Sequence, residues 1–486
     1  MNYTIITMGC KVNQYESQAM EQWMAERGHT EVGPGEAFDL AIVNTCTVTA
    51  VADKKNRNVI RRLRKQCPQA VLAVCGCYSQ VKPEDVRALG VDVISGSAGR
   101  EAFLELALAA VTDRQKRESL DEALRRREFE ILPPGGLAAR TRAMLKIQDG
   151  CSNFCSYCII PFARGPVRSL PLEEALAQVE ELVEAGYREI VVTGIEIASW
   201  GVDLDKTGAL RLPQLLDEVC RAAGEVRIRL GSLEPRIIDE TFCALLEGHK
   251  NLCPHFHLSM QSGSDTVLAR MHRRYDTARY YESVALLKAR FPGCAVTTDM
   301  IVGFPGETEA EFAESLAFIR KCGFASMHIF PYSRRPGTPA DKLPGQLGNA
   351  VKEARSAAAI AVAAEMNRGC REAMIGTLQA VLFEEEANAF PLGERWSAGQ
   401  DEGSSDEASG LRHQASGDEG TAPSTPLRSA QDDRPVGGGA PDARLWTGHA
   451  PNSIRVYAPG ADLHNRVLPV RITALYEDGV AGRIEY

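Results

Sequence analysis

Short apolar runs alternate with amphipathic stretches over the first part of the chain. The runs are YTIITMG, DLAIVNTC, AVLAVC and VDVIS, and the first three are followed by helical patterns that begin at Asn13, Val51 and Pro83. Strands that alternate with helices in this way form parallel sheets with helices on their faces. The pattern therefore predicts an N-terminal parallel α/β domain, of the Rossmann or flavodoxin-like kind, over residues 1–112.

The same alternation occurs six more times between residues 140 and 368. Strands are expected near AMLKIQ, EIVVTG, VRIRLGS, HFHLSMQ, AVTTDMIVGF and SMHIFPYS. Six such units predict a partial (β/α)6 barrel, and the working face of such a barrel is the carboxyl end of its strands. The charged stretch before it, which leads into Pro133-Pro134-Gly135-Gly136, is typical of a linker, placed here at residues 113–139.

Beyond an alanine-rich helix, Val351 to Met366, the pattern changes to short strands. These are TLQAVLFEEE, SIRVYAPG, VLPVRITALYEDG and GRIEY, which predict a small β-barrel-like domain over residues 369–486. Residues 387–443 are rich in Gly, Ser, Asp, Glu, Ala and Pro and have almost no β-branched residues. Such a composition cannot bury enough apolar surface to order itself, so we expect a disordered insertion there.

The composition is that of a globular chain of about three domains. Of the 486 residues, 44% are hydrophobic and 24% are charged, and no run of about 18 apolar residues occurs. We therefore expect neither a membrane span nor, from the first residues, a secretory signal. The net charge of −9 argues against a polyanionic partner. However, residues 387–443 contain ten acidic and four basic residues, so this segment alone contributes −6 of the net charge. Local patches therefore matter more than the sum.

Three of the fourteen cysteines have the spacing of a metal site. Cys151, Cys155 and Cys158 lie in KIQDGCSNFCSYCIIPFARG, directly after the first strand of the second domain. A closed zinc site takes four ligands in paired knuckles, and no partner knuckle follows nearby. A 4Fe-4S cluster held by three cysteines, with one iron left open, fits this spacing better.

A second trio is spread along the chain. Cys10, Cys46 and Cys77 each directly follow one of the first three strands. Because the carboxyl ends of neighbouring parallel strands meet at one edge of a sheet, the three sulfurs should converge there. We infer a second cluster with an open iron as a hypothesis. Cys75 lies inside its strand and is interpreted as a packing residue.

Several motifs together resemble one known family. GCKVNQYES, NTCTVT, GCYSQ, CSNFCSYCIIPFARG, HLSMQSGSDTVLARM, MIVGFPGET and FPYSRRPGTPA resemble the radical S-adenosylmethionine methylthiotransferases over nearly the whole chain outside residues 387–443. GCKVNQYES and the ending LYEDG look most like the tRNA branch that acts on threonylcarbamoyladenosine.

This resemblance implies the cofactors. Cys151, Cys155 and Cys158 would bind the radical 4Fe-4S cluster, to which S-adenosylmethionine attaches, and Cys10, Cys46 and Cys77 would bind an auxiliary 4Fe-4S cluster. It also implies a C-terminal RNA-binding domain of the TRAM type. No catalytic side chain is assigned beyond the clusters, because cofactors carry such chemistry and the protein orients them.

Other residues lie at the expected strand ends of the barrel. They are Thr193, Gly194, Glu234, Gln261, Ser262 and Gly303, with Tyr332-Ser333-Arg334 after the sixth strand. As a ring around one barrel mouth they would share contacts to S-adenosylmethionine or to substrate.

A basic helix is a candidate for RNA contact. It carries Lys54, Lys55, Arg61 and Arg62 among seven cations in twelve residues. Arg164, Arg168 and Arg334 near the mouth, and Arg444, Arg455, Arg466 and Arg471 in the tail, would extend a phosphate-binding surface. Tyr457 and Trp446 are more consistent with core packing than with base stacking.

The resulting hypothesis is an enzyme that places a methylthio group at C2 of N6-threonylcarbamoyladenosine at tRNA position 37, next to the anticodon. Its partners would be a tRNA anticodon stem-loop, an electron donor and a sulfur source, in the reducing cytoplasm. Three alternatives stay open: isopentenyladenosine in tRNA as substrate, a ribosomal-protein aspartate as substrate, or a non-enzymatic iron–sulfur RNA-binding protein.

Overall fold

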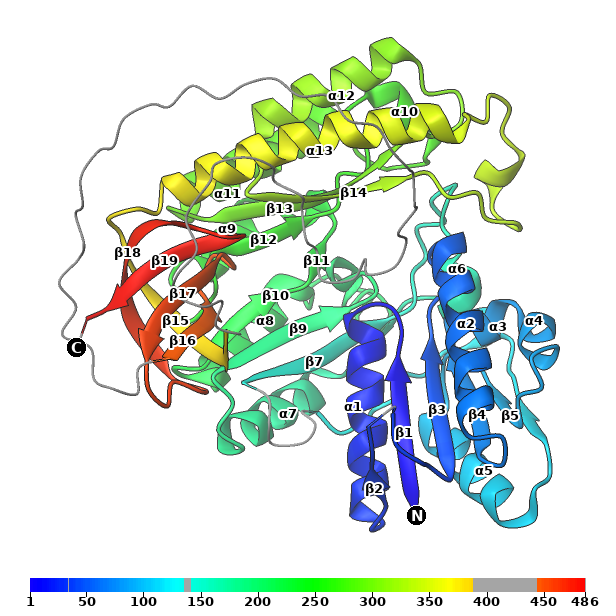
Figure 1. Ribbon diagram of the computed structural model, residues 1–486. Helices are drawn as coiled ribbons and strands as arrows, with labels where there is room; N and C mark the ends of the chain where they lie inside the picture. Colours follow the sequence, from blue (N-terminus) through cyan, green and yellow to red (C-terminus); the bar gives the residue numbers. More distant parts are fainter. Residues whose placement is uncertain (34, 135–140, 388–443, 486) are drawn as a thin grey trace, which may run out of the picture.

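A computed structural model describes residues 1–33, 35–134, 141–387 and 444–485. Figure 1 shows its three parts: an N-terminal sheet with its helices, a central curved wall of strands, and a C-terminal barrel. None of the helices in the described ranges combines the length and apolar character that crossing a membrane requires. The insertion expected at residues 387–443 lies outside the described residues except for Ala387.

The N-terminal sheet has six parallel strands in the order β2-β1-β3-β4-β5-β6. The strands are β1 (Asn2–Thr7), β2 (Thr30–Glu31), β3 (Leu40–Thr45), β4 (Val71–Gly76), β5 (Val93–Ser95) and β6 (Arg117–Ser119). The helices are α1 (Lys11–Glu26), α2 (Ala50–Gln66), α3 (Cys77–Val81), α4 (Pro83–Arg87) and α5 (Arg100–Asp113). The apolar residues of β3 and β4 alternate between a core shared with α1 and α5 and a core shared with α2. Burial on both faces explains why these strands are apolar throughout.

Two features of this sheet differ from the sequence-based expectation. The short edge strands β2 and β6 were not predicted, and β6 lies inside the expected linker, so that Arg117–Ser119 pairs with β5. The helix expected from Pro83 begins there as α4, but a short helix that was not predicted, α3, precedes it, with a division between the two. The division falls at Lys82, before Pro83, because a residue preceding proline is disfavoured in helical conformation.

The central part contains all six predicted strands. They are β7 (Arg142–Asp149), β9 (Glu189–Gly194), β10 (Arg227–Leu230), β12 (His255–Leu258), β13 (Ala295–Val302) and β14 (Ser326–Pro331), with two-residue strands β8 (Arg168–Ser169) and β11 (Ser232–Leu233). The helices are α6 (Ile160–Arg164), α7 (Leu172–Glu184), α8 (Leu212–Ala223), α9 (Glu240–Leu246), α10 (Asp265–Arg270), α11 (Thr277–Arg290), α12 (Glu309–Cys322) and α13 (Asn349–Glu372). Hydrogen bonding divides the wall into two four-stranded sheets, β10-β9-β7-β8 and β11-β12-β13-β14, which an isolated bridge between Ile228 and Leu252 joins.

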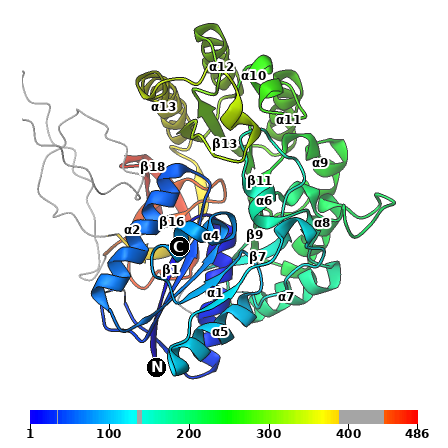
Figure 2. The same ribbon diagram turned by 90° about the vertical axis from the view of Figure 1, so that its right-hand side faces the viewer.

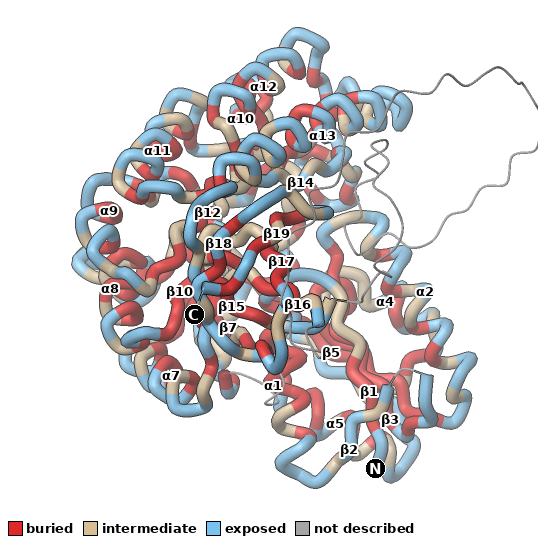
Figure 3. Tube along the Cα trace, turned by 60° about the vertical axis from the view of Figure 1, so that its left-hand side comes forward, coloured by how far each residue is buried: buried red, intermediate tan, exposed pale blue. Residues whose placement is uncertain are grey.

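Alternate residues of these strands face opposite sides of the wall. Ile190, Val192, Ile228 and Leu230 belong to the large apolar core beneath the outer helices. Their neighbours Glu189, Val191, Arg227 and Arg229 therefore face the concave inner side, because side chains alternate along a strand. Figure 3 shows the buried residues along the strands and the exposed ones along the outer sides of the helices.

The C-terminal part is a closed barrel in the order β15-β16-β17-β19-β18. Its strands are β15 (Leu378–Glu386), β16 (Arg444–His449), β17 (Arg455–Gly460), β18 (Val467–Tyr476) and β19 (Gly479–Ile484), of which β16 was not predicted. It packs against the amino ends of the central strands (Figure 1). There Arg142 Nε donates to Glu384 Oε1 at 3.0 Å, and Arg229 Nη1 donates to the Pro451 carbonyl at 2.9 Å. The domain thus closes the end of the barrel opposite to its mouth.

A buried ionic cluster joins the N-terminal sheet to the central wall. Glu16 of α1 lies 2.7 Å from Arg100 Nη2 and 3.4 Å from Lys146 Nζ of β7, and it also pairs with Arg164 of α6. All four side chains are 1% exposed or less. Burial by itself raises the pKa of Glu16, but the surrounding cations hold it at about 2, below its usual 4.5. Glu16 is therefore ionised in the folded protein.

We expect the Glu16→Gln substitution to destabilise the protein by about 3–5 kcal/mol at pH 7, because it leaves the buried Arg100 without its ion-pair partner and leaves Lys146 and Arg164 to share Asp149. Since the folded-state pKa of Glu16 lies below the unfolded value, this stabilisation is fully present above about pH 4.5 and is lost as the pH falls toward 2. The difference in the urea-denaturation midpoint between wild type and variant should shrink over that window.

Glu118→Gln provides the matched control, because Glu118 pairs with Arg87 at the surface, where their side chains are 35% and 39% exposed. Such surface pairs contribute about 0–1 kcal/mol. Equal destabilisation by the two substitutions would contradict a special role for the buried cluster.

Candidate functional site

The first cysteine trio converges at the carboxyl edge of three adjacent strands. Cys10 follows β1 as the residue preceding α1, Cys46 follows β3, and Cys77 opens α3 after β4. The thiols interact electrostatically with one another. Gly9, with φ +114°, allows this approach, because a Cβ there would lie 3.1 Å from the Cys46 sulfur. The sequence prediction that the three cysteines share one edge is thus consistent with the geometry.

The environment of this trio is uneven. Cys10 is exposed, whereas Cys46 and Cys77 are buried. Burial raises the pKa of Cys46 to about 12, and burial also raises the pKa of Cys77. Arg164 Nε donates a hydrogen bond to the Cys77 sulfur at 3.2 Å. A buried guanidinium at that place favours a thiolate, which is the form that binds metal.

The second trio lies on one loop between β7 and α6. The loop is closed by a bond from the Cys151 N–H to the Gly165 carbonyl at 3.0 Å, and it is anchored by one from the Ser156 N–H to the Met271 carbonyl at 3.0 Å. Burial raises the pKa of Cys151 to about 11 and of Cys158 to about 12, and the thiols of the trio interact with one another. Arg273 Nη1 donates to the Cys155 sulfur at 3.3 Å. Each trio therefore has one arginine against one of its sulfurs.

Glu196 was missed by the sequence analysis. It lies two residues beyond Gly194, where its N–H donates to Gln148 Oε1 at 2.8 Å, and its own Oε1 is buried without a hydrogen-bond partner in the described structure. Burial, with the nearby Glu234 charge, raises its pKa to about 7. Glu196 also interacts electrostatically with Cys151. A buried carboxyl oxygen without a partner, beside the cysteine loop, is suited to accept a hydrogen bond from a cationic group. The position of Glu196 just past a strand end was the feature of the sequence that could have identified it.

The predicted mouth residues are brought together only in part. Thr193 and Gly194 end β9, and Glu234, after β11, interacts with Glu196. Gln261, at φ +69°, bridges to Met300.

Two of the predicted mouth residues have their polar groups engaged within the protein. The Ser262 hydroxyl is buried 3.4 Å from the Ser315 hydroxyl of α12. The Gly303 N–H donates to Glu307 Oε2 at 2.7 Å. Both interactions stabilise the turns of the mouth.

The two trios flank helix α6, which follows the second trio and contains Arg164, the partner of Cys77. Figure 2 shows α6 between the central strands and the N-terminal helices. The expectation that Arg164 and Arg168 contact phosphate is wrong, because both side chains are buried, and both lie within 3.4 Å of Asp149. Their charges are balanced inside the protein by Asp149.

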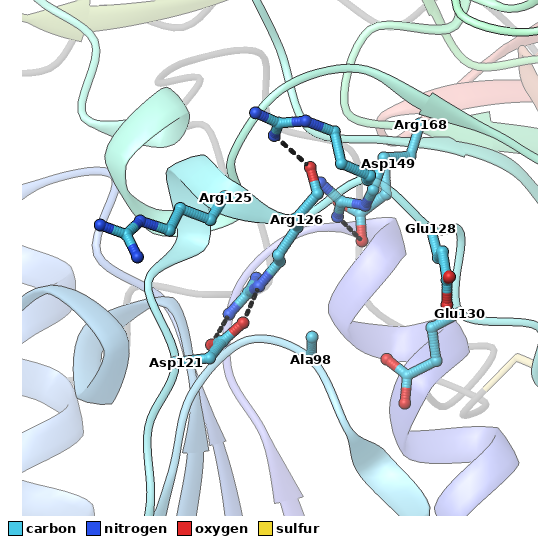
Figure 4. A pocket seen from close by; sticks show the side chains of 9 residues that line it. Ala98, Asp121, Arg125, Arg126, Glu128, Glu130, Asp149 and Arg168 are labelled. Carbon is cyan, nitrogen blue, oxygen red and sulfur yellow. Dashed lines mark hydrogen bonds and ion pairs between the residues drawn. The ribbon is translucent and has the colours of Figure 1, made fainter.

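A hollow of about 380 Å³ lies next to this junction (Figure 4). Its lining is mainly charged: Asp121, Arg125, Arg126, Arg127, Glu128, Glu130, Asp149 and Arg168, with Ala98. Arg126 Nε donates to Asp121 Oδ2 at 2.6 Å, and Arg168 pairs with Asp149. Because the lining contains four acidic and four basic side chains, the hollow has no marked preference for an anion.

The predicted basic surface is present on α2. Lys54, Lys55, Arg61 and Arg62 are exposed. Two other cations of the helix have structural partners: Arg57 donates to the Tyr78 hydroxyl at 3.0 Å, and Arg64 pairs with Asp92 at 2.5 Å.

Helix α2 starts beside the barrel mouth. The Ala50 N–H donates to the Ser333 hydroxyl at 3.0 Å, and Arg335 pairs with Asp53 at 2.9 Å. The four exposed cations therefore lie on a helix that begins at the mouth.

The predicted cations of the tail are largely paired. Arg444, Arg455 and Arg471 form ion pairs with Glu386, Asp478 and Glu485, whereas Arg334 at the mouth pairs with Asp341. Arg466 is exposed. Trp446 and Tyr457 are buried, which agrees with the packing role expected for them.

Comparison with known proteins supports this architecture. Residues 145–319 match the Radical SAM superfamily, and residues 2–96 match the uncharacterized protein family UPF0004. The chain is 43% identical to the threonylcarbamoyladenosine tRNA methylthiotransferase MtaB of Bacillus subtilis, over 72% of this chain and 77% of that protein. The chain belongs to the radical S-adenosylmethionine methylthiotransferase family.

Other methylthiotransferases and one solved structure extend the comparison. The tRNA-2-methylthio-N(6)-dimethylallyladenosine synthase of Pelotomaculum thermopropionicum is 33% identical, over 79% of this chain and 87% of that protein. The fold is similar to the radical S-adenosylmethionine methyltransferase TsrM of Kitasatospora setae, with a TM-score of 0.51 at 15% identity, over 80% of this chain and 79% of TsrM. This methylthiotransferase thus has the overall fold that its motifs predicted.

The cysteine environments predict unequal thiol reactivity in the cluster-free protein. Iodoacetamide at pH 8 should modify Cys10 at least ten-fold faster than Cys46, because Cys10 is exposed while burial keeps Cys46 inaccessible and protonated. Peptide mass spectrometry after timed anaerobic alkylation measures both rates. Cys75, fully buried in β4, is the control and should react as slowly as Cys46; similar rates at all three cysteines would contradict the described geometry.

Proposed function

We propose that this methylthiotransferase inserts a methylthio group at C2 of N6-threonylcarbamoyladenosine, at tRNA position 37 next to the anticodon. The observation that carries the proposal is the pair of cysteine trios on the two sides of α6, in a chain 43% identical to an enzyme named for that substrate. The relative named for dimethylallyladenosine is less similar, at 33%.

The residues fit two 4Fe-4S clusters and S-adenosylmethionine. Each trio offers three soft thiolate ligands, which leaves one iron of a four-iron cluster open. Within the described residues, no group of three or more His, Cys, Asp or Glu side chains is arranged to hold a metal ion. When bound, these cofactors supply the radical activation of a C–H bond and the sulfur and methyl groups, none of which amino-acid side chains can provide.

The chain's own residues bind and orient these groups. Cys151, Cys155 and Cys158 would hold the cluster to which S-adenosylmethionine attaches, and Cys10, Cys46 and Cys77 the auxiliary cluster. Arg273 and Arg164 offset the negative charge of the thiolates in a buried setting.

Glu196 is the best-placed acceptor for the ammonium group of S-adenosylmethionine, because its buried Oε1 lacks a partner in the described structure. Thr193, Gly194, Glu234 and Gln261 would form the adjoining wall for S-adenosylmethionine or the substrate base.

Removing either trio should separate the two roles. The anaerobically reconstituted enzyme should hold about eight irons per chain, and replacement of Cys151, Cys155 and Cys158 with Ala should leave about four and abolish S-adenosylmethionine cleavage. Replacement of Cys10, Cys46 and Cys77 should also leave about four irons but retain cleavage. Both variants should fail to restore the methylthio mark, detected by nucleoside mass spectrometry, to tRNA from cells that lack the gene.

A mark restored on dimethylallyl-type adenosine or on a ribosomal protein would reassign the substrate. Wild-type enzyme that binds tRNA and two clusters without cleaving S-adenosylmethionine would instead support a non-enzymatic RNA-binding protein. Product formed without Cys10, Cys46 and Cys77 would show that the auxiliary site is misassigned.

The basic helix predicts how the tRNA binds. Replacement of Lys54, Lys55, Arg61 and Arg62 with Gln should weaken binding of an anticodon stem-loop at least ten-fold at low salt and flatten the salt dependence, because fewer counterions are released. Cleavage of S-adenosylmethionine without tRNA should remain within two-fold of wild type. Gln replacement of Lys116, Lys206 and Lys250, away from α2, is the control, and an equal loss of binding there would show that α2 has no special role.

A further inference from the structure

Lys11 is a cation without a matching acid. It is the first residue of α1, directly after Cys10, and its side chain is exposed to solvent. Helix α1 packs against β7 and β9. Desolvation at the inner surface and the charges of Arg229 and Arg142 lower the pKa of Lys11, whereas Glu189 raises it. These three residues and His255 all come from the inward-facing side of the central strands. Within the described part of the chain, no hydrogen bond or ion pair joins Lys11 to a carboxylate.

The acids near Lys11 are already engaged. Arg229 donates to both oxygens of Glu189, at 2.6 and 3.0 Å, while Arg142 and Arg227 lie within 3.9 Å of the same carboxylate. Glu384 accepts from Arg142 at 3.0 Å and lies 2.9 Å from His449 Nδ1. Four cations, Lys11 with the three arginines, therefore face two carboxylates, which leaves an excess of positive charge at this end of the barrel.

An independent observation also points to a missing ligand. His255 is 9% exposed, and its Nδ1 has no hydrogen-bond partner in the described structure, while its Nε2 lies 3.2 Å from the Thr297 hydroxyl. A buried polar atom without a partner costs about 1–3 kcal/mol, so such atoms usually have a ligand or water to satisfy them. Burial, with the nearby charges of Arg229 and Lys11, lowers the pKa of His255, so His255 is neutral and lies near Lys11 on the inner surface.

The chemistry of the proposed substrate matches this region. In adenine, N6 and C2 flank N1, so a substituent on N6 lies on the same side of the base as the C2 atom that reacts. Cys10, the exposed thiol of its trio, is next to Lys11 in the chain. A base held with C2 toward that trio directs its N6 substituent along the surface that contains Lys11. The threonylcarbamoyl group ends in a carboxylate, whereas an isopentenyl group has no charge.

We propose that Lys11, together with His255 Nδ1, forms the subsite that binds the carboxylate of the threonylcarbamoyl group and so selects this base over an uncharged N6-substituted one. The proposal rests on the proposed function. Lys11 supplies the charge, and the protonated Nδ1 tautomer of His255 would donate a hydrogen bond. The arginines of the region hold Glu189, Glu384 and the C-terminal barrel in place.

The test compares two anticodon stem-loops on the reconstituted holoenzyme with S-adenosylmethionine and without reductant, so that binding is measured and no turnover occurs. One stem-loop carries N6-threonylcarbamoyladenosine and the other its methyl ester, which removes the charge and keeps the shape. Wild type should bind the acid about 10- to 100-fold more tightly, the range for a hydrogen-bonded charged group. A preference near one for wild type would overturn the subsite.

The Lys11→Met variant should bind both stem-loops about equally, and Lys11→Arg should keep most of the preference because it keeps the charge. Lys54→Met on α2 is the matched control: it should weaken both stem-loops by the same factor, since phosphates attract Lys54 in either case. The proposal is overturned if the Lys11→Met enzyme keeps the wild-type preference for the acid. It is also overturned if the substitution weakens binding of the ester-bearing stem-loop by the same factor as binding of the acid-bearing one. The second result would assign Lys11 to a backbone phosphate.

Two further measurements separate a failure of the subsite from a failure of the proposed function. Iron content must be the same in Lys11→Met and wild type, because a loss of iron would show that Lys11 supports the cluster at Cys10 instead. If nucleoside mass spectrometry finds the wild-type mark on a different base, the proposed function fails as a whole. If the mark is on threonylcarbamoyladenosine while Lys11→Met keeps full preference for the acid, the subsite alone fails.

Discussion

The ionised Glu16 at the junction of two domains is the constraint on which the arrangement of both cysteine trios depends. Its oxygens pair with Arg100 of the N-terminal domain and with Lys146 and Arg164 of the central one. Arg164 in turn bonds Cys77 and belongs to the helix that follows the second trio. A buried ion pair is weak evidence for stability, since desolvation offsets attraction, but it tolerates few geometries. The cluster therefore fixes the relative position of the two cysteine trios, which lie in different domains.

The opposite end of the central barrel uses the same chemistry for a different purpose. Arg142, Arg227 and Arg229 connect the strand beginnings to the C-terminal barrel, partly through backbone carbonyls of Ala380, His449 and Pro451. Burial would raise the pKa of Glu384, but His449 and Arg142 hold it at about 2. The two ends of the barrel are thus both ionic, one at the junction that contains Arg164 and Cys77, and one at the β-domain, near Lys11.

Most of the architecture could be predicted from the sequence because long apolar strands and helical periods are local signals. Edge strands of two or three residues, such as β2 and β6, have too few residues to show a period, and they exist because neighbouring strands pair with them. Strand β16 follows the long compositionally biased segment, which concealed its pattern. The positions of the cysteines followed from strand order alone.

The partners of charged residues could not be predicted in this way. Arg164 looks like a surface cation in its motif, yet it is buried because Glu16, 148 residues earlier in the chain, meets it only in the folded structure. Glu196 lies just past a strand end that the apolar pattern did identify, but its lone oxygen depends on burial by other segments. Charge and burial are properties of the assembled structure, whereas spacing is a property of the chain.

The pairing of β15 with β16 has a consequence for chain length. The Ala387 N–H donates to the Leu445 carbonyl at 2.9 Å, so the chain leaves the C-terminal barrel and re-enters it at nearly the same point. Closing a loop between fixed ends costs only about 0.6 kcal/mol for each doubling of its length. The barrel therefore places almost no limit on what is inserted there, and this hairpin is a site at which a whole foreign domain, such as a fluorescent reporter, could be accommodated.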